Sequence, residues 1–563
     1  MAMRNKLILL FILIKIIPLI VLAWLVWLQA DKLANALDHE YRKFSAVAKT
    51  ALQETGNQAI NDAVMALDER ARNEMERIAT DTSAAVAQFL YQRDADILYA
   101  ATLQPGVQQY KNFVDGMQSA LLQQGDWQLS EDQSSWHQVN TDVDLQPAAQ
   151  SSLPENDNAF HARGKSTLTS ALAPIYREIT FVGLDGKERY KATTAGHINQ
   201  QLVDVSERPN TFAKAETYFA HLKNLKAGEI YVSDVVGSYV PTKMIGTYTP
   251  KSADNKALDY TPEQSAYAGK ENPKGQRFDG IVRWATPVVQ DNEVVGYVTL
   301  ALDHQHIRAF TDKVVPTTER YTNVPDASTG NYAFMWDYLG RNIAHPRHYF
   351  ITGFDTDSGQ VQMPWLEQTV YDDWQASGLD YAEFATQATP FRDQNLGRKP
   401  AKQMTGKEGL RGLDCRFLNF APQCKGWFDL TENGGSGSFV IFWSGLWKLT
   451  TAASIPYYTG HYGDSLRGFG FVTVGANIDD FHAPAVASKE RIADRIVTID
   501  QQFDSILEHG VESIDDDMGK AFQYLTSSTG LMILAVIGVA IWMASYLSGR
   551  ILYLIKGVKR LQG

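Results

Sequence analysis

Histidine and cysteine are the residues of this chain whose types and spacing could hold a metal ion. Of the twelve histidines, the closest pairs are His304 with His306 and His345 with His348. Two histidines that lie two residues apart on a strand share a face and could ligate a metal, but no H-E-x-x-H sequence occurs. We expect these histidines to be ordinary polar surface residues, and we predict neither a metal site nor a cofactor.

Two segments approach the motifs of enzymes but lack an essential residue. Gly164-Lys-Ser-Thr167 ends like a phosphate-binding loop, yet Ala159 stands where the earlier glycine is required. The segment from Gly434 to Ser438 lacks the closing glycine of a nucleophile elbow. Because no nucleophile is placed with a base, we predict no catalytic residue in this chain.

The two cysteines of the chain, Cys415 and Cys424, lie nine residues apart. In an oxidising compartment a disulfide that closes this loop is favoured, and it would stabilise the fold by about 2–3 kcal/mol. A pair of free thiols and a redox sensor are the alternatives. A count of two excludes a disulfide-dense scaffold and a multi-cysteine zinc array.

Aromatic residues make up 11% of the chain and cluster in residues 439–447 and 455–458. Small-molecule pockets are typically lined by apolar and aromatic side chains with a few polar groups. The two clusters therefore indicate either a ligand pocket or the packed core of the region that contains them.

Long apolar runs near both ends predict two membrane spans. Residues 7–28 carry one charge, Lys15, and residues 531–547 carry none. At about 1.5 Å per residue the first run reaches about 33 Å, enough for a bilayer core of about 30 Å. A cleavable signal peptide is the alternative for the first run, and a buried globular helix is the alternative for the second.

The charge distribution predicts the orientation of these spans. The chain has 64 acidic and 52 basic residues and a net charge of −12. Seven basic residues and no acidic residue lie in 1–28 and 548–563, which leaves a net charge of −19 for residues 29–547. The positive-inside rule therefore places both termini in the cytoplasm and the large acidic part outside. The acidic balance argues against a nucleic-acid partner.

Two proline-free stretches predict long helices that adjoin the spans. There is no proline from Leu19 to Gln104, and apolar residues recur at steps of three and four between Ile60 and Phe89. This stripe needs either the protein's own lobes or a partner chain to cover it. A second proline-free helix is predicted from Ala487 to the second span.

Strand patterns between these helices predict an α+β fold with antiparallel sheets. Residues 177–191 and 281–302 read as hairpins, and residues 229–233 read as a short strand between them. The same pattern returns in residues 332–344 and 470–477. We infer two copies of one sensor-sized module, of which the second carries an insert.

Several of these segments together resemble the double Cache (dCache) sensory domain of bacterial transmembrane receptors. The resemblance rests on Phe89-Leu-Tyr-Gln-Arg-Asp-Ala-Asp-Ile97, on Phe181-Val-Gly-Leu-Asp-Gly-Lys-Glu188, and on Thr286-Pro-Val-Val289 followed by the strand at 296–303. It covers about residues 29–525. Residues 548–561 also resemble the opening of a HAMP linker helix, without its usual proline.

The resemblance implies two tandem PAS-like (Cache) modules on a long N-terminal helix, flanked by two transmembrane helices. The implied division of the chain is 1–28, N-terminal end and first span; 29–105, long helix; 106–315, first and membrane-distal module; 316–486, second and membrane-proximal module with an insert at 352–438; 487–526, return helix; 527–549, second span; 550–563, start of a HAMP-like linker.

Ligand-binding residues are carried over from the family by position. Relatives that bind amino acids place a carboxylate at the end of the last strand, where Asp303 stands, and use positions near Tyr231 and Asp234. Their Arg-x-Trp-Tyr motif is matched only by Arg208, which puts an amino-acid ligand in doubt. Helix capping is the alternative role for Asp303. The remaining two candidates are aromatic, Trp284 and Tyr190, with the sheet core as their alternative.

These expectations combine into a receptor of a bacterial inner membrane. An unknown small molecule would bind outside, and the spans would relay the signal to a cytoplasmic output module or partner. The resemblance also implies that the receptor is a homodimer. A membrane-tethered binding or adaptor subunit is the first alternative, and a periplasmic enzyme is the second.

Overall fold

The computed structural model describes most of the chain. The described residues are 3–122, 127–132, 136–138, 170–194, 198–241, 276–316, 320–321, 327, 330–392, 394, 411–418, 421, 423–443 and 446–560. They form two compact units, which are described separately: residues 1–66 with 483–563, and residues 67–482.

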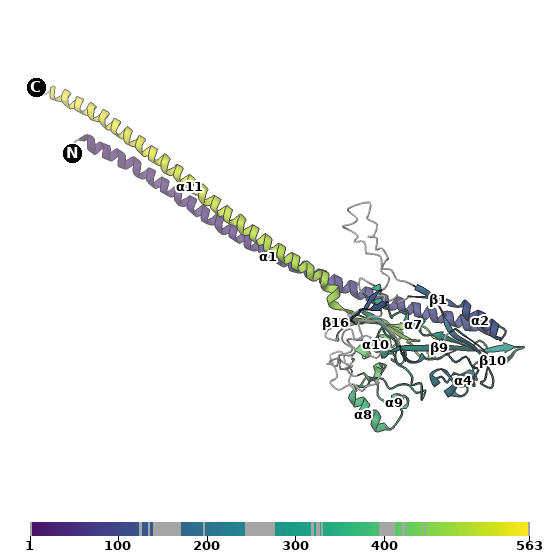
Figure 1. Cartoon of the computed structure of the whole chain (residues 1–563). Coiled ribbons are helices and arrows are strands. Elements are labelled where there is room, and N and C mark those ends of the chain that lie inside the picture. The colour runs from purple at the N-terminus through teal and green to yellow at the C-terminus, as the bar shows by residue number, and fades with distance from the viewer. Residues whose placement is uncertain are drawn as a thin grey trace. The chain divides into compact units, whose positions relative to one another are not determined.

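The first unit is a pair of antiparallel helices (Figure 1). It contains the first part of α1 (Met3–Thr102) and most of α11 (Ile478–Arg560). Lys49 Nζ lies 2.8 Å from an oxygen of Asp504 and 3.1 Å from one of Asp500. The rings of Trp27 and Phe522 meet edge to face at 6.4 Å. Both α1 and α11 contain a segment that is long and apolar enough to cross a membrane.

The second unit is built on two antiparallel sheets. The first sheet has the order β6-β5-β10-β9-β7, and β8 also pairs with β9. Its strands are β5 (Tyr176–Gly183), β6 (Glu188–Thr193), β7 (Tyr231–Val232), β8 (Val236–Pro241), β9 (Gln276–Gln290) and β10 (Glu293–Asp303). We call this sheet and the segments that cover it, residues 176–303, the first lobe.

The second sheet has the order β14-β13-β17-β16-β15. Its strands are β13 (Tyr332–Asp337), β14 (Asn342–Ala344), β15 (Ser436–Trp443), β16 (Leu446–Ile455) and β17 (Gly470–Asn477). In both sheets the opening hairpin lies beside the last strand of the sheet, so the strand order is the same. Both opening hairpins also turn on a glycine with positive φ, Gly186 at 84° and Gly340 at 90°. We call residues 332–477 the second lobe.

Shorter elements connect and cover these sheets. They are α2 (Val107–Gly116), β1 (Gln118–Leu122), β2 (Trp127–Leu129), β3 (Trp136–Gln138), β4 (Ser170–Pro174), α4 (Tyr218–Leu222), α7 (Gln305–Arg308), β11 (Val314–Val315), β12 (Arg320–Tyr321), α8 (Gln368–Ser377), α9 (Tyr381–Gln387) and α10 (Gln423–Thr431).

The last part of α1 is the element that both lobes share. Its apolar stripe, from Ala71 and Met75 to Ile97 and Ala100, is buried in one core with residues of both sheets. The stripe recurs at steps of three and four, as predicted from the sequence, and here it is covered by the chain's own lobes. Arg72 Nη1 also donates to Ser438 Oγ of β15 at 2.7 Å.

One carboxylate of α1 joins the two lobes directly. Asp94 Oδ1 accepts a hydrogen bond from Trp284 Nε1 of the first lobe at 2.8 Å and from Tyr457 Oη of the second lobe at 2.6 Å. Its Oδ2 accepts from Thr459 Oγ1 at 2.5 Å. Burial raises the pKa of Asp94, and the three hydrogen bonds oppose that rise.

The insert of the second lobe carries the disulfide of this protein. Cys415 and Cys424 are bonded, and both are buried in the aromatic core of that lobe. Cys424 is the second residue of α10, so the disulfide fixes the start of this helix to the segment that contains Cys415.

The fold class predicted from the sequence is confirmed: the chain is α+β, with antiparallel sheets and a long N-terminal helix. The hairpins expected at 177–191 and 281–302 correspond to β5–β6 and β9–β10. Local turn signals and alternation were sufficient here, because each hairpin closes over a few residues.

Replacement of Asp94 by alanine is expected to lower the stability of the second unit by about 2–4 kcal/mol, because the buried Trp284 and Tyr457 and the half-buried Thr459 lose a shared acceptor. The measurement is a thermal melt of the full chain in detergent, followed by tryptophan fluorescence. Asp81→Ala is the control: this carboxylate is exposed on the same helix and pairs only with Arg77, at 3.6 Å. Equal melting temperatures for the two variants would contradict the role of Asp94.

Replacement of both cysteines by serine is expected to lower the free energy of unfolding by about 2–3 kcal/mol, because the unfolded chain gains the entropy of an open loop. A melt in the presence and absence of a reducing agent measures this. The reducing agent should shift the melting temperature of the wild type and leave that of the double variant unchanged.

Candidate ligand-binding site

The first sheet separates apolar and charged side chains onto its two faces. Ile179, Trp284 and Leu300 point toward α1 and belong to the shared core. Glu178 and Arg283, one position away in sequence, point to the opposite face, because side chains alternate along a strand. The charged face is covered by the segment that follows β6, up to α4.

An arginine at the centre of this face makes the main contacts to its cover. Arg283 Nε and Nη2 donate to the two carboxylate oxygens of Glu216, the latter at 3.0 Å. Its Nη1 donates to Glu178 Oε1 at 2.7 Å and to Thr299 Oγ1 at 3.0 Å. The guanidinium also lies 4.8 Å from the ring centre of Tyr218. Since Glu216 lies in the cover and Glu178 in the sheet, Arg283 fastens one to the other.

A second ion pair lies beside the first on β6. Lys191 Nζ is 2.6 Å from Glu188 Oε2 and 3.6 Å from Glu178 Oε2, and all three side chains are buried. Lys191 Nζ also donates to the carbonyl oxygens of Asn199 and Gln201, each at 3.3 Å. The cover is thus held at its start by Lys191 and at its end by Arg283.

A cleft of about 320 Å³ lies between this face and its cover, near the lower end of the range for small-molecule pockets, about 300–1,000 Å³. The described residues that line it are Glu178, Glu188, Lys191, Ile198, Asn199, Val203, Val205, Asn210, Thr211, Phe212, Ala213, Glu216, Tyr218, Ser238, Val240, Asp279, Arg283 and Thr356. Four of them carry carboxylates and two carry cations. Asp279 is already paired with Arg177 at 2.8 Å and Arg277 at 3.1 Å, so the excess of negative charge comes from Glu178, Glu188 and Glu216, which face Lys191 and Arg283.

Burial and neighbouring charges set the pKa values of these groups. Burial raises the pKa of Glu188, and the carboxylate of Glu178 raises it further. Burial would also raise the pKa of Glu178, but Arg283 and Lys191 outweigh it, and this pKa lies below its ordinary value. Glu178 is therefore ionised at neutral pH. Of these two carboxylates, Glu188 is the one that takes up a proton more readily as the pH falls.

None of the six residues predicted to bind a ligand lines this cleft. Their role in ligand binding stays a prediction. Asp303 Oδ1 accepts from Arg177 Nη2 and from the backbone N–H of Gln305, both at 2.9 Å. The N-cap of α7 is His304, so Asp303 bonds to the first residue of this helix from the position before the cap. Trp284 lies on the face of the sheet that contacts α1. The other four have the following places.

Tyr190 is exposed on β6, with its ring 6.3 Å from that of Phe181. The ring of Tyr231 stacks on that of His221 at 5.4 Å. Arg208 donates to the carbonyl oxygen of Gly359 and so contacts the start of the second lobe's insert.

Asp234 takes part in a contact between the lobes. Its Oδ2 lies 2.6 Å from Arg341 Nη2 on the opening hairpin of the second lobe, and its Oδ1 lies 3.1 Å from His461 Nε2. Burial would raise the pKa of Asp234, but Arg341 and His461 outweigh it and hold this pKa well below its usual range. The ion pair therefore persists at neutral pH and joins the two sheets.

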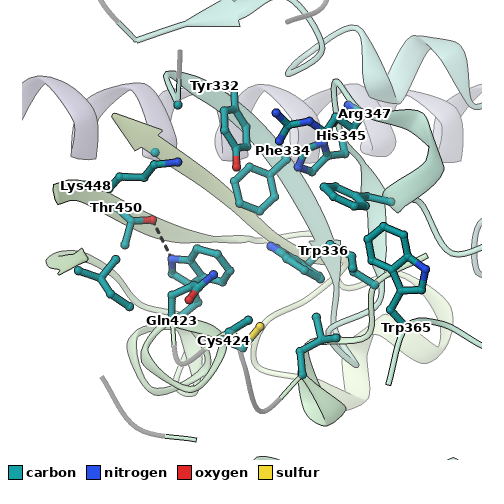
Figure 2. Close-up of a pocket in the computed structure, with 18 residues that line it drawn as sticks. Tyr332, Phe334, Trp336, His345, Arg347, Trp365, Gln423, Cys424, Lys448 and Thr450 are labelled. Carbon is teal, nitrogen blue, oxygen red and sulfur yellow. Dashed lines mark hydrogen bonds between the residues drawn. The ribbon is translucent and has the colours of Figure 1, made fainter. Parts of the chain in front are cut away.

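A second cavity lies in the second lobe, between its sheet and the insert (Figure 2). Its aromatic wall is formed by Tyr332, Phe334 and Trp336 of β13 and by Trp365 and Trp427 of the insert. The aromatic cluster expected at 439–447 contributes only Ile441 among its described side chains, because Phe442 and Trp447 are exposed. The wall residues alternate with Ala333 and Met335, which face α1.

The expectation that the paired histidines lie on the surface is wrong. His304, His306, His345 and His348 are all at most 4% exposed. They are buried because residues distant in sequence cover them: His306 Nε2 bonds to the carbonyl oxygen of Pro174 at 2.9 Å, for example. Within the described residues, no three His, Cys, Asp or Glu side chains are grouped as metal ligands.

Comparison with known proteins finds similar structures but no matching sequence. No protein-family model and no curated protein matches the chain. Among similar solved structures is the ligand-binding domain of the Pseudomonas fluorescens chemoreceptor CtaA with L-isoleucine. It is 9% identical, with a TM-score of 0.30, and the match covers 74% of this chain and 97% of that one.

Two further structures are of the same class. The ligand-binding domain of the Pseudomonas aeruginosa chemoreceptor PctB with L-Arg is 10% identical, with a TM-score of 0.29 and coverage of 74% and 98%. A domain of a sensory box/GGDEF family protein from Vibrio parahaemolyticus is 11% identical, with a TM-score of 0.27 and coverage of 55% and 74%. These are sensory domains, the class that the sequence resembles. At such TM-scores the ligands of these proteins say nothing about the ligand of this chain.

The charged residues of the cleft could have been found from one signal in the sequence. Arg283 interrupts the apolar run Ile-Val-Arg-Trp-Ala of β9, and Glu178 and Thr180 alternate with apolar residues in β5. A charge inside a strand that is otherwise apolar needs a partner, because an unpaired buried charge is costly. The identity of the partner, Glu216, is not visible in the sequence.

Replacement of Arg283 by methionine is expected to destabilise the chain by about 3–5 kcal/mol, because Glu178 and Glu216 remain buried without their cation. Adding Glu178→Gln and Glu216→Gln to this variant should recover much of the loss, since the buried charges are then removed together. Melting temperatures of the full chain measure both effects. Arg189→Met is the control, because this half-exposed side chain pairs only with the half-exposed Asp185. A triple variant less stable than Arg283→Met would contradict this account.

Proposed function

We propose that the protein is a sensor held in a membrane by α1 and α11, and that it binds a small amine-bearing metabolite in the cleft of the first lobe. The observation that carries the proposal is the lining of this cleft. Apart from Asp279, which Arg177 and Arg277 neutralise, three buried carboxylates and two cations surround a space of about 320 Å³. An ammonium group would bring this lining closer to neutrality, and it would gain charge-assisted hydrogen bonds there.

The position of Arg283 gives such a ligand a mechanical effect. Arg283 bonds to the cover through Glu216, and the next residue, Trp284, bonds to Asp94 of α1. A ligand that binds more tightly to one placement of the cover than to another would shift the population of that placement. Through β9 the shift would reach α1, the helix that also contains the first candidate span.

The ion pair between the lobes supports a signal that involves both of them. Asp234 and Arg341 join the first lobe to the opening hairpin of the second, and the last strand of the second lobe, β17, runs directly into α11. The two lobes thus connect to both long helices. We propose that these helices cross the membrane with both ends in the cytoplasm, as the charge distribution predicts, and that they act on a cytoplasmic output.

The test is a thermal melt of the full chain in lipid nanodiscs with a panel of small amines, diamines and amino acids. At least one amine is expected to raise the melting temperature by a few degrees when its concentration is far above its Kd. The neutral amide of the same carbon skeleton should have no effect. A panel in which no amine stabilises the chain would overturn the proposal.

Two variants locate the site. Glu216→Gln keeps the size of a cleft carboxylate and removes its charge, and it is expected to weaken the response to the amine about tenfold or more. Arg189→Met, on the same strand as Lys191 but exposed, should respond as the wild type does. Equal responses from both variants would place the amine elsewhere.

A further inference from the structure

The cavity of the second lobe differs in charge from the cleft of the first. Both lie on the face of their sheet that is turned away from α1. Two cations border the second cavity: Lys448 of β16, which is 6% exposed, and Arg347, which follows β14 and is 0% exposed. None of its lining residues, as far as the structure describes them, carries a carboxylate.

Lys448 is the residue that most needs an anion. Its Nζ has no hydrogen bond or ion pair with any described residue, and it lies 5.5 Å from the ring centre of Tyr332. Burial and, to a smaller extent, the charge of Arg347 together lower the pKa of Lys448 to about 8. The ammonium group is thus still protonated at neutral pH, although its burial without a counter-ion is unfavourable.

Other polar atoms of the wall are also unpaired. Trp336 is 2% exposed, and its Nε1 has no partner, whereas Trp427 Nε1 donates to Thr450 Oγ1 at 3.0 Å (Figure 2). Gln423 borders the cavity with its Oε1 unpaired. Turned by 180°, this amide would present its NH₂ group instead, since the two ends have the same shape. The cavity therefore offers donors for which the described residues provide no acceptor.

The remaining wall is apolar and the space is small. Phe334, Phe350, Trp365 and Ile441 contribute rings and an aliphatic side chain. The cavity has a volume of about 70 Å³, and a buried water needs about 10–15 Å³ on this scale. It can therefore take about five to seven atoms of that size, which corresponds to a carboxylic acid of three to five carbons.

We propose that this cavity is a second ligand site, which binds a small monocarboxylate with a short apolar chain. The carboxylate neutralises Lys448 and accepts from Trp336 Nε1, and the nearby charge of Arg347 adds to the positive potential of the cavity. The apolar chain lies against the aromatic wall. This site is independent of the amine site, because it uses a different sheet, a different cover and the opposite charge.

Butyrate, butyramide and butylamine test the proposal, since they share one size and differ in charge. The full chain in nanodiscs is titrated with each, and binding is measured by calorimetry and by the shift in melting temperature. Butyrate is expected to bind and to raise the melting temperature by a few degrees at saturating concentration. Butylamine can also occupy the amine site of the first lobe, so its arm is read as competition against bound butyrate. Displacement of butyrate by butylamine would overturn the proposal, as would binding of the amide as tight as that of butyrate, or the absence of binding by every acid of three to five carbons.

Lys448→Met locates the anion site and separates it from a structural role. The variant keeps an unbranched side chain and removes the ammonium group. Its affinity for butyrate is expected to fall at least tenfold. Its melting temperature without ligand should equal or exceed that of the wild type, because a buried unpaired charge has been removed. Lys425→Met is the matched control, since Lys425 is half-exposed and paired with Asp429 at 2.7 Å. Unchanged butyrate binding by Lys448→Met would overturn the proposal.

A second variant and the pH dependence provide further tests. Trp336→Phe keeps a ring and removes the unpaired donor, so it should weaken butyrate binding even if Lys448→Met folds poorly. The wild-type affinity should fall as the pH rises through about 8, because Lys448 loses its proton. Arg347, Tyr332 and His345 border the same cavity, and burial holds the pKa of His345 well below its ordinary value, so this ring stays neutral over that range. Arg189→Met, whose half-exposed side chain on β6 borders neither cavity, should bind butyrate as the wild type does. A flat pH profile or unaltered binding by Trp336→Phe would count against the site.

Discussion

The second unit depends on one half-buried carboxylate. Asp94 is the point at which a tryptophan of the first lobe and a tyrosine and a threonine of the second meet the same turn of α1. Each of these donors would be costly to leave unpaired in a buried position. Movement of either lobe along α1 must therefore break or rearrange these bonds, in addition to the shared apolar core and the ion pair of Asp234 with Arg341.

The two lobes share one strand order but use opposite chemistry on the equivalent face. The first sheet directs Glu178 and Arg283 into its cleft and pairs them with the cover. The second sheet directs aromatic rings and Lys448 into its cavity. The backbone arrangement fixes which positions point away from α1, and the side chains at those positions decide what can bind. A repeated fold thus does not imply a repeated ligand.

Much of the fold could be predicted from the sequence, because its signals are local. The hairpins turn on Asp185-Gly186 and Leu339-Gly340, and the stripe of α1 repeats within a few residues. The site could not be predicted in the same way. Arg283 meets Glu216 across 67 residues and Glu178 across 105, and such pairings leave no periodic pattern. The buried histidines were misjudged for the same reason, since their covering residues lie far away in sequence.

The disulfide gives the second cavity a dependence on the surroundings of the protein. Cys424 is part of the cavity wall, and its bond to Cys415 holds the start of α10 in place. In a reducing compartment the bond would open, and this wall would lose its fixed shape before any ligand arrived. The proposed acid site would then form only where the surroundings of the protein are oxidising.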